Sequence, residues 1–170
     1  MPQGEKNIFH RRLGEVNMTK MIGSLLVFLA LVSSAAAVHS PDRAFDEFGD
    51  IKCEDEMARL DSFALQLQNE PNAKGLIVVY GGRLFRGRLP KQGEADARAA
   101  RLKLYLVERR GIPKDQIMVV NWGYVEQWMV QLWMIPHGAT IPDRLPTTIP
   151  PDQIKFGKGK VNPRDYRCGI

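Results

Sequence analysis

The segment Gly93–Ile117, GEADARAARLKLYLVERRGIPKDQI, constrains the fold of this chain more than any other stretch. Its apolar side chains recur at helical spacing and form a single stripe, made of Ala95, Ala99, Leu102 and Leu106. The charged side chains lie mostly off this stripe, at Glu94, Asp96, Arg101, Lys103 and Glu108. Gly111 stands where a left-handed cap ends a helix, and Pro113 prevents continuation. The segment therefore predicts an amphipathic helix followed by the entry to a strand.

The residues before this segment predict a strand, a helix and a second strand. Residues 44–51 alternate imperfectly and indicate a short strand. An acidic first turn at 54–56 then starts a helix that Pro71 ends. Its core stripe consists of Met57, Leu60, Ala64 and Leu67, widened by Phe63 and Leu65. Residues 75–80, GLIVVY, are typical of a strand buried on both faces, and the two glycines that follow are expected to end it.

The residues after the segment predict two further strands. The first spans 117–120, Gly123 allows a sharp turn, and a long strand covers 124–135. One face of the long strand carries Trp128, Val130, Leu132 and Met134, which we expect to meet the helices. The other face carries Gln127, Met129, Gln131 and Trp133.

Together these elements predict an α/β sandwich with the order β-α-β-α-β-β. Because crossovers between parallel strands are right-handed, both helices are expected on one face of a mixed sheet. The other face is then partly open, and either the C-terminal tail or a partner would cover it. The tail, residues 137–170, is rich in proline and predicts an extended strap, with 154–156 as a further edge strand.

The N-terminal residues resemble an export signal. A basic lead-in ends at Lys20, an apolar run covers 22–32, and small residues at 33–37 suit cleavage after Ala37. Residues 1–37 are therefore predicted to be a signal peptide, 38–43 a leader and 44–136 the folded domain. Residues 1–17 would be an extension if the chain starts at Met18 or Met21. An uncleaved membrane anchor is the alternative, although the run is shorter than the roughly 20 apolar residues that a spanning helix needs.

The chain has two cysteines, Cys53 and Cys168, and both follow the predicted signal peptide. An even number in an oxidising compartment favours a disulfide, which would hold the tail against the start of the first helix. Two free thiols are the alternative, with Cys168 available for pairing between chains. The predicted location is periplasmic or secreted.

A loop rich in arginine follows the glycine pair, with Arg83, Arg86 and Arg88 within six residues. Such a cluster binds an acidic glycan or a phosphate-bearing headgroup, or it is simply solvated. Catalysis is not predicted, because the three histidines lie outside the expected helices and strands. The sequence contains no motif for a metal or another cofactor. The net charge of +5 falls to +3 without residues 1–37, which carry +2, and +3 is too small to indicate nucleic-acid binding.

The run from Gln92 to Ile117 and the order of elements resemble the C-terminal OmpA-like domain of bacterial envelope proteins. The features that carry the resemblance are the pairs Arg98-Ala99 and Tyr105-Leu106, Leu102 between them, and Gly111-Ile112-Pro113. It covers roughly residues 45–136, and the preceding helix and apolar strand are similar in layout. The family's third helix, between its last two strands, has no counterpart here.

The resemblance implies non-covalent binding of peptidoglycan. In that family the helix arginine, here Arg98, and an aspartate in the loop after the second strand hold the diaminopimelate of the stem peptide. Such a clamp works because a carboxylate takes the ammonium while a guanidinium takes the carboxylate. The aspartate has no counterpart, since the loop after Tyr80 contains no acid before Glu94.

Two hypotheses follow from the sequence. The chain is an exported envelope protein whose divergent OmpA-like domain binds peptidoglycan or another acidic ligand, through Arg98 with Arg83, Arg86 and Arg88. Alternatively, it is a structural module that has lost ligand binding and docks to an envelope protein. Neither hypothesis involves nucleic acid, and membrane contact would arise only from an uncleaved signal segment.

Overall fold

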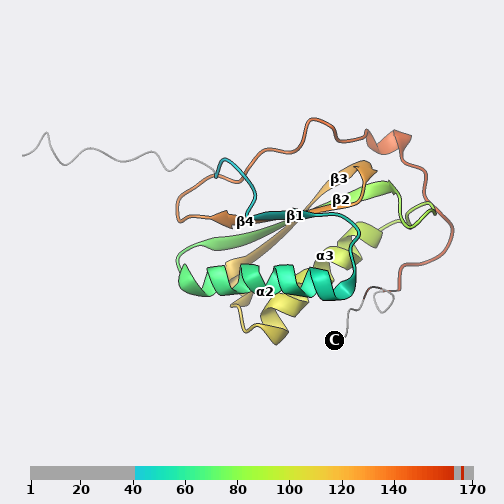
Figure 1. Ribbon diagram of the computed structural model, residues 1–170. Coiled ribbons are helices and arrows are strands. Elements are labelled where there is room, and N and C mark those ends of the chain that lie inside the picture. The colour runs from blue at the N-terminus through green and yellow to red at the C-terminus, as the bar shows by residue number, and fades with distance from the viewer. Residues whose placement is uncertain (1–40, 163–165, 167–170) are drawn as a thin grey trace, which may run out of the picture. The chain divides into compact units, whose positions relative to one another are not determined.

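A computed structural model describes residues 41–162 and Tyr166, which form one mixed four-stranded sheet and two helices (Figure 1). The elements are β1 (Asp46–Phe48), α2 (Cys53–Asn69), β2 (Lys74–Leu84), α3 (Glu94–Leu104), β3 (Ile117–Gln127) and β4 (Met129–Ile135). A π-helical turn, Tyr105–Arg109, continues α3, and 3-10 turns occur at Lys114–Gln116 and Pro151–Gln153. The strand order is β1-β4-β2-β3, with β2 and β3 parallel and β4 antiparallel to both β1 and β2. The predicted α/β fold and its element order are confirmed.

The apolar stripes of both helices face the sheet, as the spacing predicts. In α3 the whole stripe is buried, and Gly111 ends the helical segment with φ of 68°. Two predictions of side-chain position were wrong. Leu65 of α2 is 60% exposed, whereas Glu94 and Arg101 of α3 are buried although they were expected to lie off the stripe. Both charged side chains are buried because they form ion pairs there.

The strand boundaries differ from those predicted. Gly81 and Gly82 do not end β2, which continues to Leu84. A Cβ at Gly81 would lie 2.3 Å from the Tyr124 ring, so this glycine lets β3 approach closely rather than breaking the strand. Gly123 lies inside β3, where the pairing with β2 shifts register, and it forms no turn between strands. The chain turns at Trp128 instead, so the single strand expected at 124–135 is two.

The two sheet faces have separate cores. The predicted face of Trp128, Val130, Leu132 and Met134 packs with both helices, which confirms that assignment. On the opposite face, Trp133 and Met129 lie in a second cluster that also contacts Ala139 and Leu145 of the tail. Leu145 donates its backbone N–H to the Tyr80 hydroxyl at 3.2 Å. In Figure 1 the segment after β4 runs along the side of the sheet opposite the helices.

The strand expected at 154–156 does not form. One bridge between Lys91 and Gly157 and one between Tyr124 and Ile149 connect this segment to the domain. In the described part of the chain, no helix is both long and apolar enough to cross a membrane.

Cys53 begins α2 and is not a free cysteine. Its predicted partner, Cys168, lies outside the described residues, as do the predicted signal peptide and the first part of the leader. The Cys53–Cys168 pairing and the export signal therefore stay predictions.

Candidate functional site

The loop after β2 forms a tight hairpin that brings arginines together. Phe85 and Arg88 exchange backbone hydrogen bonds of 2.7 and 3.1 Å, and the two residues between them, Arg86 and Gly87, have φ of 49° and 76°. Positive φ at both central positions is typical of a type I′ turn, which prefers Asn, Asp or Gly at the first of them. The turn thus holds Arg86 in a conformation that a residue with a large side chain rarely adopts.

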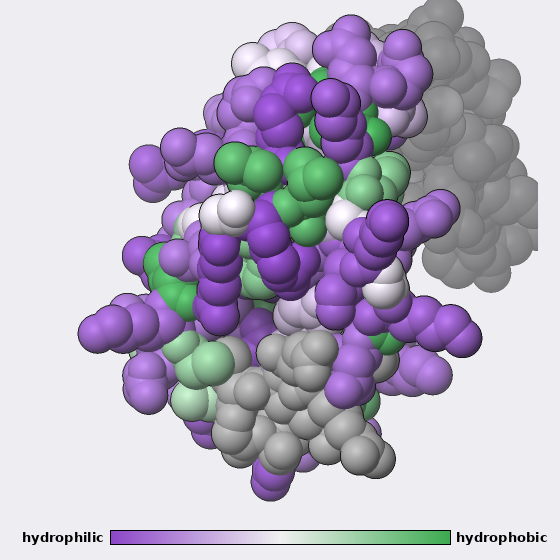
Figure 2. Space-filling model, turned by 90° about the vertical axis from the view of Figure 1, so that its right-hand side faces the viewer, coloured by the Kyte–Doolittle hydropathy of each residue, from purple (hydrophilic) through white to green (hydrophobic). Residues whose placement is uncertain are grey.

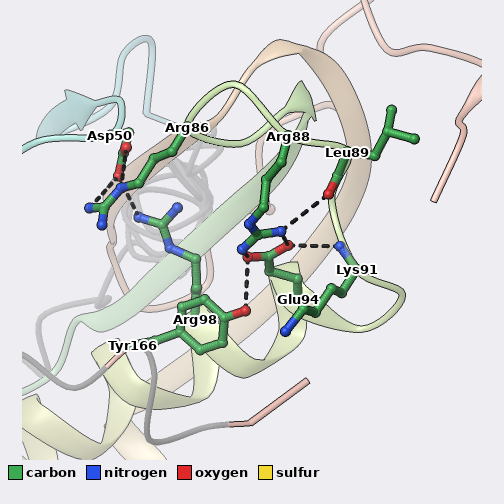
Figure 3. A network of polar contacts seen from close by, with 8 residues as sticks. All are labelled: Asp50, Arg86, Arg88, Leu89, Lys91, Glu94, Arg98 and Tyr166. Carbon is green, nitrogen blue, oxygen red and sulfur yellow. Dashed lines mark hydrogen bonds and ion pairs between the residues drawn. The ribbon is translucent and has the colours of Figure 1, made fainter. Parts of the chain in front are cut away.

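Three guanidinium groups surround the Phe85 ring. The carbon atoms of the Arg86, Arg88 and Arg98 guanidiniums lie 5.2, 4.9 and 4.5 Å from the ring centroid. Figure 3 shows Arg86 and Arg88 on the loop and Arg98 approaching from α3. Each position suits a cation–π contact. The arginines that the sequence indicated as ligand-binding therefore meet at one place, except for Arg83.

Arg98 is the most enclosed of these arginines. Its side chain is 6% exposed, and its guanidinium lies between the Phe85 ring and the Trp128 ring, 3.9 Å from the Trp128 centroid. Nη2 donates to Oδ1 of Asp50 at 3.3 Å, whereas Nη1 is buried without a hydrogen-bond partner among the described residues. Burial lowers the pKa of Arg98 to about 10, and the neighbouring Asp50 carboxylate only partly opposes this effect.

Asp50 is the carboxylate that contacts Arg98. It lies between β1 and α2, and its side chain is 28% exposed. Arg86 donates to both carboxylate oxygens, from Nε to Oδ2 at 2.9 Å and from Nη2 to Oδ1 at 3.2 Å. Burial alone would raise the Asp50 pKa, but the hydrogen bond from Arg86 and the charge of Arg98 hold it below its usual value. A carboxylate and a buried arginine are therefore adjacent after all.

A second carboxylate, Glu94, lies at the start of α3 and is 3% exposed. Arg88 donates to its two oxygens at 2.6 and 3.0 Å, and the Lys91 backbone N–H donates at 2.8 Å. The hydroxyl of Tyr166, from the tail, donates to Oε1 at 2.8 Å (Figure 3). Burial raises the Glu94 pKa, but these hydrogen bonds outweigh it and lower the pKa overall. Glu94 thus joins the loop, α3 and the tail.

An open cleft of about 530 Å³ lies beside Asp50. Its lining includes Arg83, Phe85, Arg86, Glu126 and Trp128. A much smaller cavity of about 10 Å³ lies between Arg98, Trp128 and Gly82. Besides Nη1 of Arg98, Nε1 of Trp128 is a buried donor without a partner in the described residues. Figure 2 views the molecule from the right-hand side of Figure 1, where hydrophilic residues surround a small hydrophobic patch.

The other predicted arginines are already paired. Arg83 contacts Glu126 at 2.9 Å, away from the Phe85 ring, while Arg86 and Arg88 hold Asp50 and Glu94. The sequence did not indicate that the carboxylates of Asp50 and Glu94 belong to this site, and it gave no role to Phe85 or Tyr166. Nothing in the local sequence links Asp50 to Arg98, which is 48 positions away. The alternating pattern around Trp128 was the one usable signal, because it predicts that this tryptophan meets the helices, as it does.

Comparison of the chain with protein-family models, curated proteins and solved structures finds no match. Within residues 41–162 and Tyr166, no three His, Cys, Asp or Glu side chains lie close enough to hold a metal ion.

Proposed function

We propose that this chain is an exported envelope protein with a divergent OmpA-like domain that binds peptidoglycan non-covalently. The proline-rich tail acts as a strap over the second sheet face. In this proposal the ligand is the diaminopimelate portion of a stem peptide, which carries a carboxylate and an ammonium on the same carbon. Arg98 takes the carboxylate and Asp50 takes the ammonium.

The observation that carries the proposal is the state of Arg98. A guanidinium that is almost fully buried normally has all its donors paired. Here the aromatic rings of Phe85 and Trp128 fix the plane of Arg98, one nitrogen contacts Asp50, and another has no acceptor in the described residues. A ligand carboxylate would pair with that nitrogen once the loop that carries Phe85 moves aside, because the cavity beside Arg98 holds only about 10 Å³.

The position of Asp50 also supports the proposal. The family's clamp needs a carboxylate near the helix arginine. The position of that carboxylate in the sequence does not matter to the chemistry. Asp50 reaches Arg98 from the loop after β1, and the open cleft that Asp50 lines gives a ligand access to this carboxylate. The divergence from the family would then be a change of loop and not a loss of the acid.

The alternative is a structural module that docks to another envelope protein. The pairing of Arg83, Arg86 and Arg88 with acids favours it, because these side chains are satisfied without a ligand. In that case the contact between Arg98 and Asp50 serves only to fasten α3 to the segment before α2.

Sedimentation with insoluble peptidoglycan tests the proposal. We expect the purified protein to be retained, and the variants Arg98→Ala and Asp50→Asn to lose most of that retention. Arg109→Ala is the matched control for Arg98→Ala, since Arg109 is exposed on the turn after α3 and its removal takes away the same single positive charge. Circular dichroism during thermal unfolding shows whether each variant is folded.

The outcomes separate the two functions. Retention that Arg98→Ala and Asp50→Asn leave unchanged would reject the clamp, and absence of retention would reject peptidoglycan binding. Arg98→Ala removes a buried side chain, whereas Asp50→Asn keeps the shape of a partly exposed one but leaves the buried Arg98 without its carboxylate. Retention is therefore compared only between variants that thermal unfolding shows to be folded.

A further inference from the structure

The conformation of Arg86 has no structural benefit for the turn that contains it. Among the residues that the structure describes, Arg86 is the only non-glycine with positive φ. Asn at the same position would suit the type I′ turn better. Residues held in sparsely populated backbone regions are concentrated at functional sites, where the local strain serves a purpose.

The side chain of Arg86 shows what that purpose is. From this turn the guanidinium reaches Asp50 and contacts both carboxylate oxygens, at 2.9 and 3.2 Å. Those oxygens are the groups that a ligand ammonium would need. Arg86 is also 65% exposed, so its ion pair with Asp50 is screened by solvent and easily exchanged.

We infer that Arg86 is an internal occupant of the cation position on Asp50, so that a ligand ammonium binds there only by displacing Arg86. This inference rests on the proposed function. A ligand with a carboxylate alone gains only Arg98, whereas a ligand with an adjacent ammonium also replaces Arg86 on Asp50. The apparent affinity of the second kind of ligand is reduced by the fraction of molecules in which Arg86 occupies Asp50.

The neighbouring arginine cannot play this role. Arg98 is 6% exposed and packed between two aromatic rings, so it stays in place when a ligand arrives. Arg86 is on a hairpin turn that lines the cleft, its guanidinium carbon lies 5.2 Å from the Phe85 centroid, and its side chain is 65% exposed, so its release leaves no buried charge. The two arginines on Asp50 therefore divide into a fixed one and a displaceable one.

Isothermal titration calorimetry with two probes tests the inference. The probes are meso-diaminopimelate and pimelate, which have the same carbon chain with and without the amino groups. The variant Arg86→Asn frees Asp50 and improves the turn. The control is Arg83→Asn, which removes an arginine that lines the same cleft. Arg83 contacts Glu126 and does not contact Asp50.

We expect Arg86→Asn to bind diaminopimelate roughly two- to fivefold more tightly than the original protein, which is the worth of one exposed ion pair. Pimelate affinity should be unchanged or lower in that variant, and Arg83→Asn should leave the preference between the two probes unaltered. Weaker or equal binding of diaminopimelate by Arg86→Asn would overturn the inference, and so would tighter binding of both probes.

The inference and the proposed function fail differently. If peptidoglycan retention depends on Asp50 and Arg98 but Arg86→Asn does not improve diaminopimelate binding, only the inference is wrong. If neither the original protein nor Arg86→Asn binds diaminopimelate and there is no retention, both are wrong. Binding by Arg86→Asn alone would support the inference and show that the original site is closed by its own arginine.

Discussion

The ion pair between Glu56 and Arg101 gives a direct test of how α2 and α3 are held together. Glu56 lies in the first turn of α2 and Arg101 in the last turn of α3, with side chains 4% and 9% exposed. Burial lowers the pKa of Arg101 to about 10. The variant Arg101→Met fills a similar volume but leaves the Glu56 carboxylate buried without its cation. Breaking such a pair costs about 3–5 kcal/mol.

The double variant Glu56→Leu with Arg101→Met removes both charges. Because two buried charges lose hydration on folding, replacing them with apolar groups is close to neutral, and we expect stability within about 1 kcal/mol of the original. Urea unfolding followed by tryptophan fluorescence measures both free energies. If the free energy of unfolding of Arg101→Met falls by less than about 1 kcal/mol, or if the double variant is as unstable as the single one, the charges of this pair do not hold α2 and α3 together.

Three further predictions concern the surroundings of the site. Gly82→Ala should lower the free energy of unfolding in urea by about 2 kcal/mol or more, because its Cβ would lie 2.5 Å from the backbone oxygen of Leu84. Gly81→Ala should lower this free energy less, since its Cβ would meet only the partly exposed Tyr124 ring. Tyr166→Phe should lower the free energy of unfolding by about 1–2 kcal/mol, because it removes a hydrogen bond to the buried Glu94 carboxylate, and an unchanged midpoint in thermal unfolding would contradict that role. Because the Glu94 pKa is lowered, the ionised side chain contributes its full stabilisation above the ordinary pKa of 4.5, and this stabilisation is lost as the pH falls below that value. In an acid titration, the free energy of unfolding of Glu94→Gln should therefore fall less steeply with pH than that of the original protein.

The fold followed from the sequence wherever one periodic pattern decided the packing. The stripe of α3 and the alternation of β4 each place apolar residues on one face, and both faces are buried as expected. Strand length was not predictable in this way. Gly81 and Gly82 are typical strand breakers in isolation, but in this sheet they make room for Tyr124 and for the backbone at Trp128. Such a reason for a glycine exists only in the folded structure.

The candidate site was half predictable for a related reason. Arg98 could be singled out because it lies within a segment that resembles a known family. Asp50 could not, because its contact with Arg98 depends on where the loop after β1 passes the end of β2. Arg83 and Arg86 illustrate the same limit. The sequence shows that these two arginines are close along the chain, but their partners, Glu126 and Asp50, lie near the ends of other strands.

The two buried arginines of α3 both connect this helix to the segment around the start of α2. Arg98 and Arg101 are three positions apart, so they lie on neighbouring parts of one helix face. Both pair with the chain at the start of α2, Arg98 with Asp50 just before the helix and Arg101 with Glu56 in its first turn. If a ligand takes Asp50 from Arg86, as we propose, the separate pair between Arg101 and Glu56 still joins α3 to the first turn of α2. We therefore expect ligand binding at Asp50 to leave the position of α3 unchanged.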